Sequence, residues 1–225
     1  MGHGRGPREA PLSHTSRGGD GPDRLRPTFA EVVRRRRMTR AFLPTAVAPE
    51  TIDRLLDGAR RSPSAGNTAA IEFLVLDEPA SVDAYWSTTL PDARRATFPW
   101  PQLLDAPVLV IPWVAPAAYV ARYAEPDKAR TGLGSSIDDW TVPYWFVDGG
   151  AAVMSLLLGA EAEGLGALLF GLFEHEDAVR ERFAVPADRR AVGAIAIGHR
   201  APDRPSASAG RPRPSLDAVV HRGTW

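Results

Sequence analysis

Arginines and small polar residues gather in three separated segments of the chain. The first runs from Arg36 to Arg40, where a predicted helix gives way to an extended segment. Guanidinium groups bind phosphate through paired hydrogen bonds and stay charged near neutrality. The second is the loop Pro63 to Asn67, whose small residues let backbone groups approach a flat polar edge. The third is Arg211-Pro212-Arg213. Together they predict a site for a phosphorylated, ring-bearing ligand.

Each segment taken alone also has a simpler interpretation. The arginine run is typical of a solvated helix end, where positive charge is favourable to the helix dipole. The loop Pro63 to Asn67 is equally typical of an ordinary helix-to-strand connection. The arginines at 211 and 213 fit a solvated loop. The prediction of a binding site therefore depends on the combination and order of the three segments.

Helical and strand patterns alternate along the chain, and the elements that they predict must position the three segments. Thr28 and Glu31 form a Thr-x-x-Glu capping box that predicts the start of a helix, and Pro49 suits the first turn of a second helix. Strands are predicted at residues 71–76, 107–113, 165–170 and 192–197, and further helices at residues 149–163 and 176–183. Helices interleaved with strands indicate an α+β or α/β layered domain.

The helix predicted over residues 149–163 is small and apolar almost all round, with Asp148 as its expected N-cap. Such a helix belongs in the centre of a domain or at a subunit interface, and it is too short to span a membrane. Residues 1–27 are rich in Gly, Pro, Arg and Ser and almost free of apolar side chains, which predicts a disordered tail. Residues 28–225 then form a single domain.

The composition excludes several classes of function. The 225 residues include 27 basic and 27 acidic side chains, and this neutral balance argues against nucleic acid or an anionic membrane as partner. The chain has no cysteine, which rules out disulfides, thiolate nucleophiles and cysteine-ligated metal sites. No metal site is predicted. With no secretion signal, we expect a cytoplasmic enzyme or binding protein.

The order of these segments resembles the FMN-dependent nitroreductase family. Residues Phe29 to Phe42 are similar to its opening helix and Arg-Arg-Ser-x-Arg-x-Phe motif, and Ala59 to Asn67 are similar to its Ala-x-x-Ala-Pro-Ser-x-x-Asn segment. Residues 148–166 resemble its central helix and the glycine pair that follows. Residues 194–198 and 211–220 resemble its final strand and closing arm. The resemblance therefore covers essentially the whole predicted domain.

The resemblance implies an α+β fold, a three-layer α/β/α sandwich around a mostly antiparallel sheet. It also implies a homodimer with two FMN sites at the subunit interface. Arg36 and Arg37 fall where the family binds the FMN phosphate, and Met38 lies in the same motif. Arg40 falls where a basic residue meets the pyrimidine edge of the flavin, where a fixed cation stabilises the charge of the reduced ring.

The remaining matched positions complete the implied cofactor site. Phe170 and Gly171 match the segment whose backbone approaches the N5–O4 edge of the flavin. Either Arg211 or Arg213 matches a C-terminal contact to the phosphate. Ser64 and Asn67 match positions that reach the flavin from the other subunit, and Pro63 and Ala65 belong to the same cofactor-binding loop.

Two positions depart from the family pattern. Met38 replaces a common serine, which removes one hydroxyl ligand to phosphate, and Ala69 stands where many members have glutamine. Neither change removes the arginines. The implied substrate pocket falls on an aromatic segment, with Trp140, Tyr144 and Trp145 as its expected walls.

The resemblance implies a two-step exchange of electrons. NADH or NADPH reduces the flavin, which then passes two electrons to a nitroaromatic, a quinone or another small organic acceptor. The flavin carries this chemistry, so no catalytic side chain is expected. Two alternatives remain open: an FMN-dependent oxidase or dehydrogenase of a biosynthetic intermediate, and a flavin-binding protein without turnover.

Overall fold

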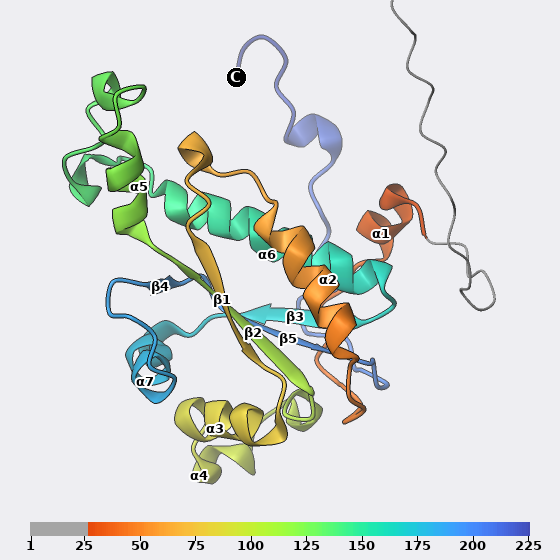
Figure 1. The fold of residues 1–225 in the computed structure, drawn as a ribbon. Coiled ribbons are helices and arrows are strands. Elements are labelled where there is room, and N and C mark those ends of the chain that lie inside the picture. The colour runs from red at the N-terminus through yellow and green to blue at the C-terminus, as the bar shows by residue number, and fades with distance from the viewer. Residues whose placement is uncertain (1–26) are drawn as a thin grey trace, which may run out of the picture.

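The computed structural model describes residues 27–225, which form a five-stranded sheet with helices on both faces (Figure 1). The predicted disordered tail lies outside the described residues, apart from Pro27. The strands lie in the order β1-β2-β5-β3, β4 pairs with β2, and all these pairings are antiparallel. Their bounds are β1 Ile71–Leu76, β2 Val108–Val114, β3 Gly166–Phe170, β4 Arg190–Ala191 and β5 Ala194–Gly198.

The two faces of the sheet are covered by different helices. The helices are α1 Phe29–Arg35, α2 Pro49–Arg60, α3 Pro79–Thr89, α4 Asp92–Arg95, α5 Pro116–Tyr123, α6 Tyr144–Ala162 and α7 Glu176–Arg182. In β2, Leu109 and Ile111 pack into a core with α3 and α7, whereas Val108 and Val110 pack into a core with α2 and α6. Because neighbouring residues of a strand point to opposite faces, this alternation builds three layers. The expected α+β sandwich is confirmed.

Helix α6 begins earlier than the sequence predicts. It starts at Tyr144 after Pro143, so Asp148 lies inside the helix and is not its N-cap. The carboxylate of Asp148 instead accepts hydrogen bonds from the Ala65 N–H and the Tyr119 hydroxyl. With 19 residues, α6 is long and apolar enough, by length and composition alone, to cross a membrane. Helix α6 contacts α2 and the sheet, and residues such as Leu156 are fully buried. Its apolar composition is therefore explained by its place in the core of this domain.

Helices α3 and α5 are not predicted from the sequence. Both begin at a proline, and neither has a capping side chain at its N-terminus. Helix α3 buries Val82, Tyr85 and Trp86, which have helical spacing. Helix α3 closes the lower face of the sheet (Figure 1), so side chains that sequence patterns left unassigned form part of the site described next.

Candidate functional site

The arginine segment lies beside the edge strand β3. Met38 forms a parallel bridge with Ala167, and the Thr39 N–H donates a 3.0 Å hydrogen bond to the Ala167 carbonyl. A Cβ added to Gly166 would lie 2.8 Å from the side chain of Thr39, which is buried. The segment can therefore approach β3 this closely because the strand begins with a glycine.

The end of α1 is fixed by a buried carboxylate. Glu161 in α6 is 4% exposed and forms ion pairs with Arg35 at 3.5 Å and with Arg200 at 2.5 Å. Arg36 follows directly and is the C-cap of α1. Its Nη1 atom is buried and has no hydrogen-bond partner among residues 27–225. A buried guanidinium nitrogen without an acceptor is unfavourable, so this atom is suited to bind an anionic oxygen.

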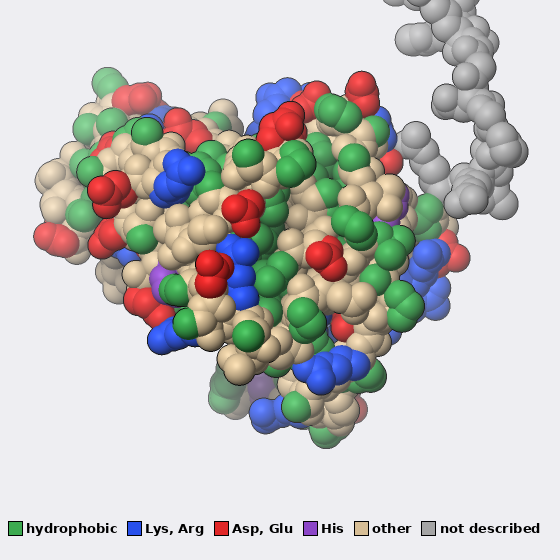
Figure 2. All heavy atoms as spheres, turned by 90° about the horizontal axis from the view of Figure 1, so that it is seen from below, with side chains coloured by type: hydrophobic (Ala, Val, Ile, Leu, Met, Phe, Trp, Pro, Cys, Tyr) green, Lys and Arg blue, Asp and Glu red, His purple; other side chains and the backbone are tan. Residues whose placement is uncertain are grey.

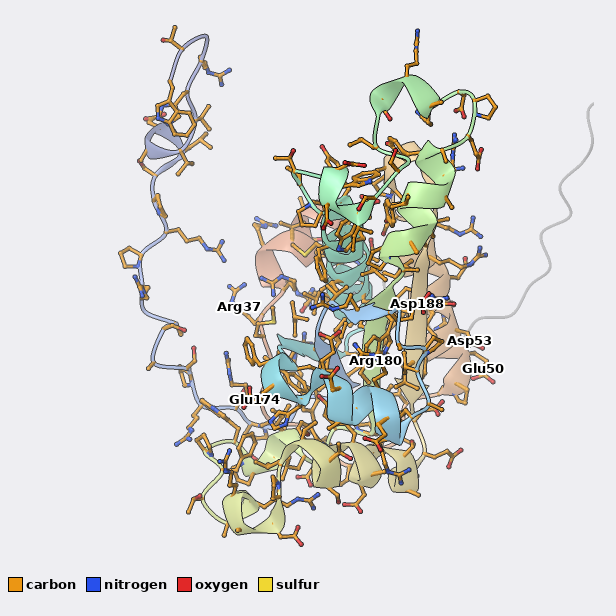
Figure 3. All side chains as sticks on the ribbon, turned by 90° about the vertical axis from the view of Figure 1, so that its left-hand side faces the viewer. Arg37, Glu50, Asp53, Glu174, Arg180 and Asp188 are labelled. Carbon is orange, nitrogen blue, oxygen red and sulfur yellow. The ribbon has the colours of Figure 1, made fainter. Side chains whose placement is uncertain are left out.

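Arg37 is oriented differently from Arg36. Its Nη1 atom donates to the carbonyl oxygens of Arg34 at 2.6 Å and Arg36 at 2.9 Å. These bonds cap the last turn of α1, as basic side chains commonly do at helix C-termini. The exposed side chain extends toward the side of the molecule on which the C-terminal arm runs (Figure 3). Arg37 thus has a structural role in this chain besides any contact to a ligand.

A cavity of about 340 Å³ lies where β3 ends. Arg40, Phe170 and Gly171 all line it, so the structure brings these three predicted residues together. The Phe170 ring stacks on Trp86, with ring centroids 5.7 Å apart and planes inclined by 12°. The Arg40 guanidinium carbon lies 5.3 Å from the ring centroid of Trp100. The result is an apolar, aromatic cavity with a cation at its edge.

The loop Pro63 to Asn67 lies apart from the cavity at β3. The Ala65 N–H donates a 2.8 Å hydrogen bond to Asp148, and the Gly66 carbonyl accepts one from Arg122 Nε at 2.8 Å. The Tyr119 hydroxyl donates to the same Asp148 oxygen at 2.7 Å. Burial and this hydrogen bond raise the pKa of Tyr119. None of the loop residues lines the cavity at β3.

The sequence that forms these elements matches a known protein family. A family model described as the nitroreductase family matches residues 33–199, which begin within α1 and end just after β5. The chain belongs to the nitroreductase family. The match includes the arginine segment, the small-residue loop and the cavity at β3.

Solved nitroreductase structures have the same fold. An FMN-dependent nitroreductase from Clostridium difficile is 18% identical, with a TM-score of 0.60 over 86% of this chain and 98% of that chain. A candidate nitroreductase from Exiguobacterium sibiricum, solved in complex with FMN, is 22% identical, with a TM-score of 0.65 over 87% and 97% of the two chains. A candidate NADH oxidase from Clostridium acetobutylicum is 21% identical, with a TM-score of 0.62 over 86% and 99%.

Most of the other predicted residues lie away from the cavity. Trp140 and Trp145 are buried with Tyr119, whereas Tyr144 is half exposed, and none of the three predicted wall residues lines the cavity at β3. Arg211 and Arg213 are exposed on the C-terminal arm, which runs away from the body of the chain (Figure 1). Within the described chain, neither arginine side chain forms a hydrogen bond or ion pair with Arg36, and neither lines the cavity at β3. A single copy therefore holds the predicted residues in separate groups.

Sequence patterns missed several residues that line the cavity. Trp86 comes from the unpredicted helix α3, Trp100 from the loop after α4, and His175 from the turn before α7. The helical spacing of Tyr85, Trp86 and Thr89 is a signal that could have placed three of the walls on one helix. Trp100 and His175 stand in loops without such a pattern, so only the fold brings them to the site.

Replacing Asp148 by alanine should release the small-residue loop from α6. The carboxylate accepts two hydrogen bonds, so we expect the free energy of unfolding to fall by about 2–3 kcal/mol. Urea unfolding would measure this change. Asp138→Ala is the matched control, because Asp138 is exposed and its carboxylate accepts no hydrogen bond within residues 27–225. Equal stabilities for the two variants would contradict the role given to Asp148.

Proposed function

We propose that the protein is an FMN-dependent oxidoreductase that takes electrons from NADH or NADPH and passes two of them to a small organic acceptor, such as a nitroaromatic or a quinone. Family membership supports the oxidoreductase class, and one fold relative was solved with FMN. The observation that carries the proposal is the buried, unpaired Nη1 of Arg36, on the segment that leads to the cavity at β3.

The residues present fit the two chemically different ends of FMN. Arg36 offers a buried guanidinium nitrogen to a phosphate, and its position at the end of α1 is fixed through Arg35 and Glu161. Arg40 lies four residues further along an extended segment, at the edge of the aromatic cavity. A phosphate would therefore bind to the guanidinium group of Arg36, while a flat ring would enter the cavity.

The side chains around the cavity have distinct roles in this proposal. A bound FMN would supply the redox chemistry, the transfer of two electrons between the nicotinamide and the acceptor. Trp86 and Phe170 form an apolar wall that excludes water from one side of the cavity. Arg40 supplies a fixed positive charge, which stabilises negative charge on a reduced ring. The backbone N–H of Arg40 donates to Asp203 at 2.7 Å, which holds the chain in place at this point.

We further propose that the active form is a homodimer. The small-residue loop lies apart from the cavity of its own chain, so Ser64 and Asn67 would reach a flavin in that cavity only from a second copy. Helix α6 leaves Val147 and Met154 about half exposed, which is unusual for large apolar residues on a core helix. The arm after Ala201 exposes Leu216, Val219 and Trp225, which a partner chain would cover.

The first test is an anaerobic absorbance spectrum of the purified protein, supplied with FMN, before and after addition of NADH or NADPH. We expect the two flavin bands to appear on the protein and to bleach with at least one of the nicotinamides. Flavin bands that persist under excess of both nicotinamides would contradict the proposed electron donor. Absence of bound flavin would contradict the proposed cofactor.

Arg36→Ala should weaken FMN binding. A hydrogen bond to a charged group contributes about 1.5–3 kcal/mol, which corresponds to an increase in Kd of roughly tenfold to a hundredfold. Fluorescence titration of the apoprotein with FMN measures this Kd. The control is Arg34→Ala, which removes an equal charge from the exposed last turn of α1. An unchanged Kd for Arg36→Ala would rule out its contact with the phosphate.

Met154→Glu should break the dimer while leaving the fold of each chain intact. Met154 is 46% exposed, so the carboxylate stays in water in a monomer but would be buried between two copies. Light scattering would report the loss of dimer mass, and circular dichroism would report the fold. Leu43→Glu is the control, because Leu43 is similarly exposed, at 43%, but lies outside α6. A monomeric unmodified protein, or a Met154→Glu variant that stays dimeric, would overturn this interface.

A further inference from the structure

Among the described residues, His175 is the one side chain around the cavity at β3 that titrates near neutral pH. The lining side chains with a charge or a hydroxyl group are those of Arg40, Tyr85, Thr89 and His175. A guanidinium group keeps its proton in proteins, and a threonine hydroxyl gives up no proton in this range. Tyr85 is 1% exposed, and burial raises the pKa of its hydroxyl, so this group keeps its proton as well. An imidazole, by contrast, titrates between about pH 5 and 8.

The turn between β3 and α7 holds His175 at the cavity. The His175 N–H donates a 2.8 Å hydrogen bond to the carbonyl of Leu172, which is buried and lines the same cavity. Between them, Phe173 has a φ of 46°, a left-handed conformation that is unfavourable for a residue with a Cβ atom. A Cβ added to Gly171 would lie 2.6 Å from the Phe173 ring, so the turn closes this tightly because a glycine follows β3. The backbone therefore restricts where the imidazole can lie.

The imidazole of His175 is accessible to water as well as to the cavity. Its side chain is 32% exposed, and its Nε2 atom lies 3.7 Å from the Glu174 carboxylate, which pairs with it when the ring is protonated. Glu174 lies on the same side of the molecule as Arg37 (Figure 3). On the face seen from below, histidine atoms are visible only as small patches among hydrophobic and charged side chains (Figure 2). A half-buried group of this kind can take a proton from solvent and pass it to a bound ligand.

The carboxylates at the start of α7 are occupied by arginines. Glu176 accepts hydrogen bonds from Arg180 and Arg190, both at 3.0 Å. Asp177 forms an ion pair with the same Arg180. Within the described part of the chain, Glu174 is therefore the carboxylate of this turn that remains to pair with the imidazole.

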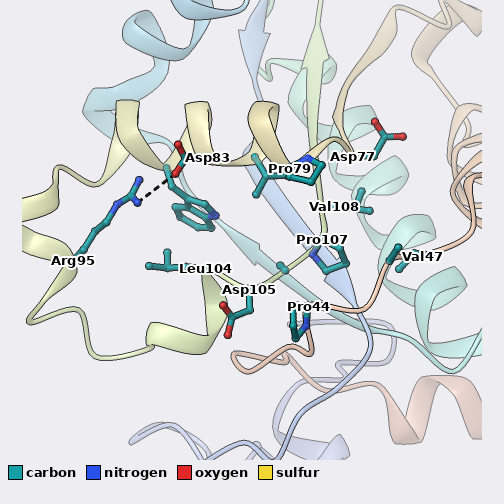
Figure 4. Close-up of a pocket in the computed structure, with 14 residues that line it drawn as sticks. Pro44, Val47, Asp77, Pro79, Asp83, Arg95, Leu104, Asp105, Pro107 and Val108 are labelled. Atoms are coloured by element: carbon teal, nitrogen blue, oxygen red, sulfur yellow. Dashed lines mark hydrogen bonds and ion pairs between the residues drawn. The ribbon is translucent and has the colours of Figure 1, made fainter.

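Helix α3 packs against α7 and, within residues 27–225, brings no carboxylate to the cavity at β3. Its one aspartate, Asp83, forms an ion pair with Arg95 at 3.4 Å. Asp83 lines a separate cavity, around which Figure 4 shows two further carboxylates, Asp77 and Asp105. Among the described residues that line the cavity at β3, a ligand therefore meets the imidazole of His175 and no acidic side chain.

The proposed acceptors need a proton that a hydride does not carry. Reduction of a quinone to a hydroquinone takes up two electrons and two protons, and so does reduction of a nitro group to a nitroso group with loss of water. A hydride carries both electrons and one of the protons. The second proton must come from an acid beside the acceptor or, more slowly, from water.

We propose that His175 is the acid that supplies this second proton, an inference that rests on the proposed oxidoreductase function. An N–H bond of the imidazolium breaks, and an O–H bond forms on the acceptor as the acceptor takes up the electron pair. The neutral imidazole that remains takes a proton from water before the next turnover. His175 is then a catalytic side chain, in a site whose sequence motifs predict none.

Two acceptors that differ in their need for protons test this role. Duroquinone takes up protons with its electrons, whereas ferricyanide takes up an electron alone. Stopped-flow mixing of the reduced, FMN-loaded protein with each acceptor gives two rate constants. For the unmodified protein, we expect the ratio of the quinone rate to the ferricyanide rate to fall about tenfold per pH unit above the range in which the imidazole is protonated. A ratio that is constant between about pH 5 and 9 would overturn the proposal.

His175→Gln keeps a polar side chain that does not titrate. It should lower the quinone-to-ferricyanide ratio about a hundredfold at about pH 6 and remove its dependence on pH, because general acid catalysis contributes roughly 10²–10⁴-fold. His199→Gln is the matched control, since His199 is half-buried but does not line the cavity. Free imidazole added to His175→Ala should restore part of the ratio, which it could not do for a structural defect. Equal ratios for His175→Gln and the unmodified protein would rule out the proton donor.

A measurement without electron transfer tests the place of the imidazole. In nitrogen-15 spectra of the histidine side chains, the His175 signals should shift when FMN is added to the apoprotein, because His175 lines the cavity that the ring enters. The His175→Gln variant identifies these signals, and His199 provides the reference. Bound FMN without a shift at His175 would contradict the proposal, whatever the rates.

Failure of this proposal is distinguishable from failure of the proposed function. If neither nicotinamide reduces the flavin, the proposed function fails, and dithionite can reduce the bound FMN so that the two acceptors still test His175. If a nicotinamide reduces the flavin and both acceptors reoxidise it, but the ratio ignores pH and His175→Gln, the function stands and the proton donor is wrong. If no FMN binds, both proposals fail together.

Discussion

The close approach of one extended segment to one edge strand determines most of this structure. The Thr39 N–H reaches the Ala167 carbonyl because Gly166 leaves room for the Thr39 side chain. That pairing fixes Met38 between the two cores of the domain and places Arg36 at one end of the segment and Arg40 at the other. A side chain at Gly166 would separate the segment from β3, and the two arginines would lose their relative positions. A backbone contact therefore sets the spacing of the charged groups.

Regular elements were predicted well where local signals were strong. The capping box of Thr28 and Glu31 starts α1, and β1 has the predicted bounds of residues 71–76. The start of α6 was wrong because an aspartate before two glycines looks like an N-cap, whereas Asp148 binds groups from two other elements. Only tertiary structure decides between a local and a distant partner for such a side chain. Helix α3 was missed although Pro79 begins it as Pro49 begins α2, because its apolar side chains are less confined to one face than those of α2.

The sequence motifs name candidate residues for the site but not their arrangement. Arg40, Phe170 and Gly171 were each identified from motifs, and the fold brings them to one cavity. Trp86 had only the helical spacing that it shares with Tyr85 as a sequence signal, and Trp100 had none, since its position depends on how the loop after α4 covers the sheet. The small-residue loop was identified with equal ease, yet it lies apart from the cavity within one chain. The motifs predict which side chains belong to the candidate site, whereas packing determines which of those side chains lie together.

The position of Trp86 has a consequence for the thermodynamics of the molecule. The indole of Trp86 lines the cavity at β3, where it stacks on Phe170, and it also lines a second cavity of about 360 Å³ between the segment Pro44 to Val47 and the residues before β2. A tilt of that ring toward one cavity would take volume from it and give volume to the other. Occupants of the two cavities would then be linked, and linkage is reciprocal: whatever factor one occupant imposed on the affinity of its neighbour, the neighbour would impose in return. Such coupling would need only one aromatic side chain to change its position.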